Sequence, residues 1–239
     1  MFITTKAIVL SAIKYSESDL IVKCYTAEDG LKTYLLKHVL KARKGKIKAA
    51  YFQPLTQLEL IVRHNTKGNL NFIKEVKISN PYATIAFSIV KQTIVIFLSE
   101  VLTKSLKEEE RNTQLFEYLE TSLTWFDTHD SISNFHLLFL VNLTKHLGFY
   151  PEKENSDYPF FNLNEGRFSS SIPKQNRISE ENVTNLKVLF KTNFDELEKL
   201  QFNASVRQAV LEILIDYYIL HLPGFSKPKS LSVLKTVFS

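Results

Sequence analysis

The chain has 239 residues, of which 44% are apolar, 12% aromatic and 23% charged, with only six Gly and seven Pro. This composition predicts one large or two small globular domains and excludes collagen-like, low-complexity and disordered chains. The single cysteine, Cys24, excludes an internal disulfide and a cysteine-rich zinc site, and favours a reducing compartment. The apolar stretches 7–13 and 92–99 are too short for a signal peptide or a membrane span, so we expect a soluble, cytoplasmic protein without membrane partners.

Basic residues concentrate in the first third of the chain. Residues 1–80 contain 14 Lys and Arg against 6 Asp and Glu, whereas residues 81–239 contain 16 against 19. This asymmetry indicates a polyanionic partner for the N-terminal part and an ordinary surface elsewhere. It also predicts a domain boundary near Asn80 and Pro81, which gives domains 1–80 and 81–239.

The first 80 residues have the pattern of β-strands. Short apolar or alternating runs at 6–13, 20–26, 31–36, 55–62 and 70–78 predict five strands. Asp29-Gly30 predicts a tight hairpin turn, and residues 65–69 predict another. A closed sheet protects the edges of so small a β-unit, so we expect a five-stranded barrel of the oligonucleotide-binding (OB) type.

After Tyr82 the apolar period lengthens to that of helices. The pattern predicts helices at 82–106, 111–126, 131–147 and 204–220, interrupted at 148–173 by a loop and a small hairpin with its turn at 164–166. The predicted fold class is therefore α+β, an N-terminal OB-type barrel followed by an α-helical domain with an inserted hairpin. The sequence has no visible repeat of 20–50 residues, so we do not expect a solenoid.

The strongest local signal is a basic segment, which we define as residues 37–48. A loop of this charge between barrel strands can follow a phosphate chain without reading its sequence. A solvated surface loop is the alternative, but the predicted barrel and the local charge balance favour nucleic-acid binding. The segment has no acidic residue and six cations: Lys37, Lys41, Arg43, Lys44, Lys46 and Lys48. Further cations with faces unknown from sequence are Lys23, Lys32, Arg63, Lys67, Lys74 and Lys77.

Aromatic residues in the predicted barrel can either stack on bases or fill the core, and the sequence does not separate these roles. They are Tyr15, Tyr25, Tyr34, Tyr51, Phe52 and Phe72.

Motifs of catalysis are not found in the sequence. It has no phosphate-binding loop, H-E-x-x-H, G-x-S-x-G or G-x-G-x-x-G pattern, so we expect a protein that is not an enzyme and needs no cofactor. His136 and His146 are too far apart on one helix to share a metal, and Cys24 alternates with apolar strand residues as a buried thiol does. Glu17 and Asp19 precede a strand, where turn formation is favoured over a paired carboxylate site.

The order of these features resembles the bacterial recombination mediator family RecO. The resemblance spans nearly the whole chain, in pieces that are each short. In the first domain the similar segments are 7–10, 15–22, 25–26, 30–31, the basic segment, 52–55 and 58–60. In the second they are 139–140, 147–151 and 229–234.

The resemblance implies a DNA repair and recombination protein without bond chemistry. Members bind single- and double-stranded DNA, anneal complementary strands, and work with RecR to load the recombinase onto DNA coated by single-strand-binding protein. The resemblance further implies a groove in the helical domain for the acidic, aromatic-ended tail of that protein. Candidate cations for its rim are Lys91, Lys104, Lys107 and Arg111.

Many family members also carry a four-cysteine zinc element after the segment that matches 148–151. This chain has no cysteine between Tyr158 and Ser171. We therefore predict no zinc, with Tyr158, Phe160, Phe161 and Phe168 packing the hairpin instead. Two other functions stay open at this point: an RNA-binding or ribosome-associated OB protein, and a small-molecule enzyme with a pocket at 158–168.

Overall fold

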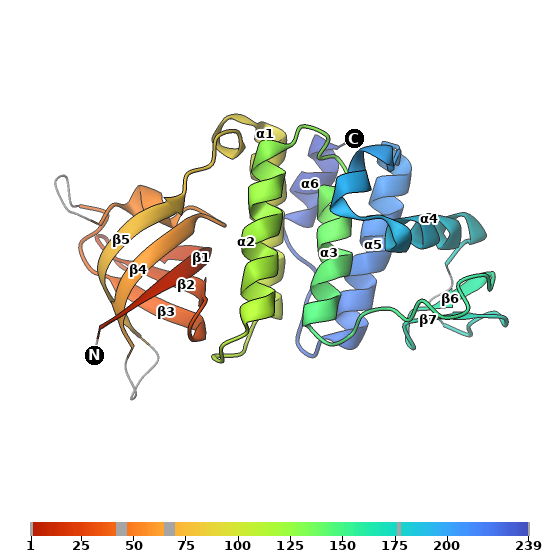
Figure 1. Ribbon diagram of the computed structural model, residues 1–239, viewed down its shortest axis with the longest axis horizontal. Helices are drawn as coiled ribbons and strands as arrows, with labels where there is room; N and C mark the ends of the chain where they lie inside the picture. The colour runs from red at the N-terminus through yellow and green to blue at the C-terminus, as the bar shows by residue number, and fades with distance from the viewer. Residues whose placement is uncertain (1, 42–46, 65–69, 176–177, 239) are drawn as a thin grey trace. The chain divides into compact units, whose positions relative to one another are not determined.

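The computed structural model describes residues 2–41, 47–64, 70–175 and 178–238. These residues form two compact units, 1–128 and 129–239. Unit 1 holds a five-stranded sheet and two helices, and unit 2 holds the remaining helices and a two-stranded hairpin (Figure 1). The predicted α+β fold class is confirmed. Among the described residues, no helix combines the length and the apolarity that crossing a bilayer requires.

The sheet of unit 1 is antiparallel with the strand order β3-β2-β1-β4-β5. One face of the sheet forms a core that includes Cys24 and Tyr34, and β1 is buried at four successive residues, Ala7–Leu10. The sheet does not close fully. Its outer strands meet at a single parallel bridge between Tyr34 and Asn71, where the Asn71 amide also donates to the Thr33 carbonyl at 3.0 Å. The strands are β1 (Ile3–Lys14), β2 (Leu20–Thr26), β3 (Gly30–Leu36), β4 (Gln57–Arg63) and β5 (Phe72–Asn80).

A bulge in β1 connects helix α1 of unit 1 to the sheet. The β1–β2 register shifts between Val9 and Ser11, which leaves the Leu10 carbonyl outside the ladder. That carbonyl accepts hydrogen bonds from Ser99 Oγ at 2.5 Å and Thr103 Oγ1 at 3.2 Å, both on α1 (Ile89–Ser105). Helix α2 (Thr113–Thr128) completes the unit.

The predicted helix 82–106 was wrong over its first seven residues. Residues 82–88 form a linker with one 3₁₀ turn, η2 (Ile85–Phe87), and α1 begins at Ile89. The N–H groups of Ala83, Thr84 and Ile85 donate to the Asp127 carboxylate at 2.7–2.9 Å. These long-range bonds satisfy the backbone that a helix would otherwise have satisfied.

Unit 2 packs α3 (Phe135–His146), α4 (Glu180–Lys191), α5 (Ala204–His221) and α6 (Leu231–Val237) around an apolar core. Tyr218 of α5 is fully buried and donates its hydroxyl to the Leu140 carbonyl of α3 at 2.8 Å. His136 of α3, which the sequence left open as a core or a surface histidine, is buried, and burial lowers its pKa to about 3.

The predicted hairpin is present as β6 (Phe160–Asn162) and β7 (Arg167–Ser169). Phe161 and Phe168 pack edge to face, with ring centroids 5.1 Å apart, and both contact the ring of Phe190 on α4. Gly166 has a φ of +67°, and a Cβ there would overlap the Tyr217 hydroxyl. The turn at 164–166 therefore requires glycine.

Candidate nucleic-acid interface

The stem of the basic segment is fixed to the sheet. A turn at 37–41 follows β3, and its Val39 side chain is buried in the sheet core. Its His38 has a φ of +58° and donates its N–H to Asp19 Oδ1 at 2.7 Å, while the Leu40 N–H donates to the Ser18 carbonyl at 2.9 Å. The His38 N–H first, and then the Ser18 hydroxyl, lower the pKa of Asp19. Asp19 thus acts as a turn residue, as expected.

The described cations of the basic segment are Lys37, Lys41 and Lys48, and all three are exposed. Lys41 Nζ lies 3.0 Å from Glu17 Oε2, and the two side chains are 62% and 88% exposed. An ion pair as exposed as this contributes little, so a phosphate can replace the carboxylate at small cost. The predicted Arg43, Lys44 and Lys46 lie outside the described residues.

Three of the other predicted cations of unit 1 are paired with acidic side chains. Lys32 Nζ lies 3.1 Å from Glu109 Oε2, Lys77 Nζ 2.7 Å from Glu59 Oε1, and Lys74 Nζ 3.9 Å from Glu75 Oε1. Arg63 is exposed at the end of β4, Lys23 is half-buried in β2, and Lys67 lies outside the described residues. Lys32, Lys74 and Lys77 are thus paired with carboxylates, whereas Arg63 and the described cations of the basic segment are exposed.

The aromatic residues of the sheet divide into two groups. Tyr25, Tyr34 and Phe52 are buried and serve the core. Tyr51 is half-buried against the same core. Tyr15 and Phe72 are 64% and 56% exposed, which makes them surfaces on which a base can stack.

A chain of polar side chains, which no local sequence pattern indicated, crosses one end of the sheet. Tyr34 Oη lies 2.9 Å from His64 Nε2, and His64 Nδ1 lies 2.8 Å from Asp29 Oδ2. Burial raises the pKa of Tyr34 and lowers that of His64, with Asp29 opposing the second shift. Because Tyr34 is fully buried, this chain ties the β2–β3 turn to the end of β4 and offers no nucleophile to a substrate.

The four predicted partner-binding cations lie on α1 or just beyond it. Lys91 is only 3% exposed, and its Nζ donates to Thr84 Oγ1 at 2.6 Å and to the Asp127 carbonyl at 2.9 Å. This burial places Lys91 inside the packing of unit 1 and removes it from a surface rim. Lys104 is 3.7 Å from Glu100, Lys107 is exposed, and Arg111 is 3.3 Å from Glu28.

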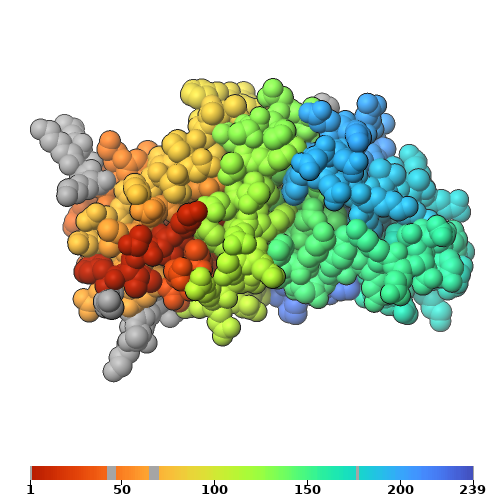
Figure 2. Space-filling view, viewed as in Figure 1, coloured from red at the N-terminus to blue at the C-terminus, as the bar shows by residue number. Residues whose placement is uncertain are grey.

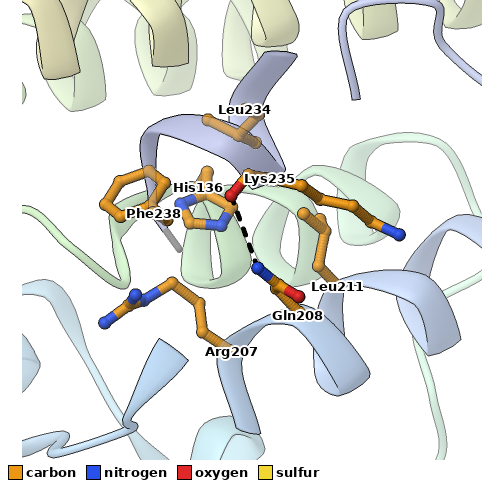
Figure 3. Close-up of a pocket in the computed structure, with 7 residues that line it drawn as sticks. All are labelled: His136, Arg207, Gln208, Leu211, Leu234, Lys235 and Phe238. Atoms are coloured by element: carbon orange, nitrogen blue, oxygen red, sulfur yellow. Dashed lines mark hydrogen bonds between the residues drawn. The ribbon is translucent and has the colours of Figure 1, made fainter. Parts of the chain in front are cut away.

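Unit 2 contains a small pocket between α3, α5 and α6 (Figure 3). Leu211, Leu234 and Phe238 give it apolar walls. The Arg207 guanidinium lies 4.9 Å from the centroid of the Phe238 ring, and Gln208 donates to the Lys235 carbonyl at 3.4 Å. Lys235 Nζ contacts Glu212, so this cation is paired with a carboxylate. The volume of the pocket is only about 10 Å³, the space of roughly one water. No local sequence pattern indicates this site, because its residues come from three helices.

The hairpin of unit 2 does not fit a zinc ion. Its two strands are joined by the Phe161–Phe168 contact, and the only cysteine of the chain is Cys24, a fully buried residue of β2. Within the described ranges, no three His, Cys, Asp or Glu side chains gather as metal ligands do. Tyr158 is 40% exposed and Phe160 half-buried, so the packing rests on Phe161 and Phe168.

Comparison with known proteins agrees with this architecture of a sheet followed by helices. The model of the family "Recombination protein O N terminal" matches residues 1–82, and that of "Recombination protein O C terminal" matches residues 86–231. Proteins named DNA repair protein RecO from Flavobacterium psychrophilum and Flavobacterium johnsoniae are 49% and 48% identical over the full length of both chains. The protein of that name from Phocaeicola vulgatus is 38% identical over 98% of each chain.

The chain is thus a two-part protein of the recombinational repair class. It belongs to the RecO family of DNA repair proteins.

Proposed function

We propose that this chain is a DNA-binding recombination mediator that anneals complementary strands and helps to load the recombinase onto DNA coated by single-strand-binding protein. The observation that carries the proposal is the basic segment, whose exposed cations follow a stem fixed by Asp19 and Val39. Because the stem is fixed to the sheet, it presents positive charge at one place on the surface. Charge alone binds phosphates and does not select a base sequence. Membership of a DNA repair family favours DNA over the RNA-binding alternative.

In this proposal, residues 1–80 bind nucleic acid and residues 81–239 recruit protein partners. Cations of the basic segment neutralise the phosphates of two strands, which lowers their repulsion and lets them pair. No nucleotide hydrolysis or metal is needed for that step. If about six cations meet phosphates, log affinity falls with log salt at a slope of about −4 on single strands and about −5 on duplex. The place of action is the cytoplasm, at the nucleoid.

Two protein partners belong to the proposal. The first is RecR, which we propose on the basis of the family alone. The second is the acidic, aromatic-ended tail of single-strand-binding protein, which needs an apolar pocket and a cation for its terminal carboxylate. The surface around Arg207, Lys235 and Phe238 places apolar side chains beside cations, and because the pocket there holds only about 10 Å³, we propose that the tail lies over it. Lys104, Lys107 and Arg111 stay as alternative sites on unit 1.

Binding of a fluorescent tail peptide tests this assignment. We expect Lys235→Gln to weaken it at least about fivefold, because one charge-assisted hydrogen bond contributes roughly 1.5–3 kcal/mol. Lys229→Gln, a nearby exposed lysine outside the pocket, is the control. Equal affinities for the two variants would refute the pocket assignment.

The whole proposal is tested by annealing of complementary oligonucleotides precoated with single-strand-binding protein, without ATP and at two salt concentrations. We expect faster annealing that weakens as salt rises. Replacing Lys41, Arg43, Lys44 and Lys46 by Ala should remove this acceleration. The matched control replaces four exposed lysines of unit 2, at 153, 174, 191 and 199, and should anneal like the unchanged protein. No acceleration by a folded protein, or equal affinity for RNA and DNA with no tail binding, would replace this proposal with the RNA-binding one.

A further inference from the structure

A large groove lies within unit 1, beside the point where the basic segment ends. Its walls come from η1 (Ala49–Phe52) and the turn after it, from the end of β5 and from the linker and first half of α1. Its volume is about 510 Å³, within the roughly 300–1,000 Å³ that is typical of small-ligand sites. Figure 2 shows the linker, in yellow, standing out at the surface of unit 1.

The groove walls are apolar and uncharged. Ile78, Val95 and Ile96 supply aliphatic surface, and none of the described residues that line the groove is acidic or basic. Next to it, Phe87 is 87% exposed and Ile89 is 76% exposed. Apolar side chains that are exposed together mark a surface that binds something.

Three amide side chains give the groove hydrogen-bonding edges. They belong to Gln53, Asn80 and Gln92. Asn80 donates to Thr124 Oγ1 at 2.9 Å, and Gln92 donates to the Ala86 carbonyl at 2.7 Å, so both amides are held in place by their NH₂ groups. Each amide oxygen remains an acceptor, and amides pair well with the edges of nucleobases.

The position of the charge identifies the occupant. Lys48, the last cation of the basic segment, is exposed and stands two residues before Ala50, which lines the groove. Phosphates and bases alternate along a nucleic acid strand in the same way, with charge outside and flat apolar rings beside it. An aliphatic peptide would fill the walls but would leave the amides and the adjacent cations without a use.

We propose that this groove takes unpaired bases of a single DNA strand, with Phe87 as a stacking surface and Lys48 at the neighbouring phosphate. The inference rests on the proposed function and adds to it a second mode of contact, through bases. Duplex DNA hides its bases, so the groove selects single strands from duplex. During annealing the bound bases leave the groove as they pair with the complementary strand.

The experiment compares two 20-nucleotide probes, oligo-dT and the same backbone without bases, by fluorescence anisotropy over a range of salt. We expect the full-length protein to bind oligo-dT roughly 5- to 150-fold more tightly, the range that stacking of one base gives. Phe87→Ala and Ile96→Gln should lower this ratio at least about fivefold. Their affinity for the abasic probe and their salt slope should not change. Tyr158→Ala, which removes an exposed aromatic ring from unit 2, is the matched control.

Each result has one meaning. A ratio near one in the unchanged protein, or a ratio that Phe87→Ala leaves intact, overturns the groove proposal while salt-dependent binding of both probes keeps the proposed function. Absence of binding to either probe overturns both. If the two variants lose a protein partner and keep the oligo-dT preference, the groove is a protein-binding surface and the inference is wrong.

Discussion

Replacing Asp127 by Asn tests how the linker of unit 1 is held. The Asp127 carboxylate accepts N–H groups from Ala83, Thr84 and Ile85, and the Asp127 side chain is almost fully buried. Asparagine keeps the shape but offers one acceptor oxygen and brings an NH₂ group against the donors. At least one buried N–H then loses its partner and another loses its charge-assisted bond. With about 1–3 kcal/mol for each, the expected loss of unfolding free energy is roughly 2–6 kcal/mol.

Urea unfolding followed by tryptophan fluorescence measures this loss. The chain has one tryptophan, Trp125, two residues from the substituted position and on the same helix, so the signal reports on unit 1. Asp130→Asn, at an exposed position just beyond the helix, is the control and should change stability by less than about 0.5 kcal/mol. A loss below about 1 kcal/mol for Asp127→Asn would refute the reasoning.

The same carboxylate predicts a dependence on pH. Burial opposes its ionisation, but the three backbone N–H groups prevail and hold the pKa of Asp127 below its usual value. A lowered folded pKa gives stability that is complete above the unfolded pKa, about 3.9, and is lost as pH falls through the folded value. The difference between the unchanged protein and Asp127→Asn should therefore shrink as pH is lowered from 5 towards 2.

Four further outcomes are expected. Gly30→Ala should lower the free energy of unfolding in urea by roughly 2–4 kcal/mol, because Gly30 has a φ of +61° and a Cβ there would overlap the Glu110 carbonyl. Gly148 has a φ of +82° but lies in open space, so Gly148→Ala should cost only about 1 kcal/mol. Stability of unit 2 should fall as pH drops from about 6.5 to about 3 because His136 stays neutral when folded, and His136→Leu should remove that slope in acid unfolding. Elemental analysis should find no stoichiometric zinc. The last variant replaces four cations of the basic segment by Ala: Lys41, Arg43, Lys44 and Lys46. It should bind every DNA sequence more weakly by the same factor, show a single-strand salt slope smaller by about 3, and keep the melting temperature of the unchanged protein.

The sequence predicted the strands well because their signals are local. Asp29-Gly30 specified the β2–β3 turn, and Gly30 does have the positive φ that such a turn requires. Cys24 was predicted to be buried from its alternation with Leu20 and Val22, and all three residues belong to the sheet core. Helices α4 and α6 were not predicted. The first has low overall hydrophobicity, and the second spans only seven residues.

The parts that the sequence did not predict depend on partners distant along the chain. Lys91 was read as a surface cation, but Thr84 and the Asp127 carbonyl hold it inside unit 1, and the second of these lies 36 residues away. The groove is similar, because its walls come from three segments that no local pattern links. Only the basic segment was visible beforehand, since a run of charge is a property of composition.

The buried thiol of β2 has a practical consequence for studying this protein. Cys24 is fully buried, so reagents do not reach its thiol, and burial also raises the pKa of that thiol, so little of the reactive thiolate forms in the folded chain. Maleimide labelling of a cysteine introduced at an exposed position should therefore be selective without removing the native one. Conversely, the rate at which Cys24 itself is modified measures how often the sheet opens, so this side chain is an intrinsic probe of local unfolding.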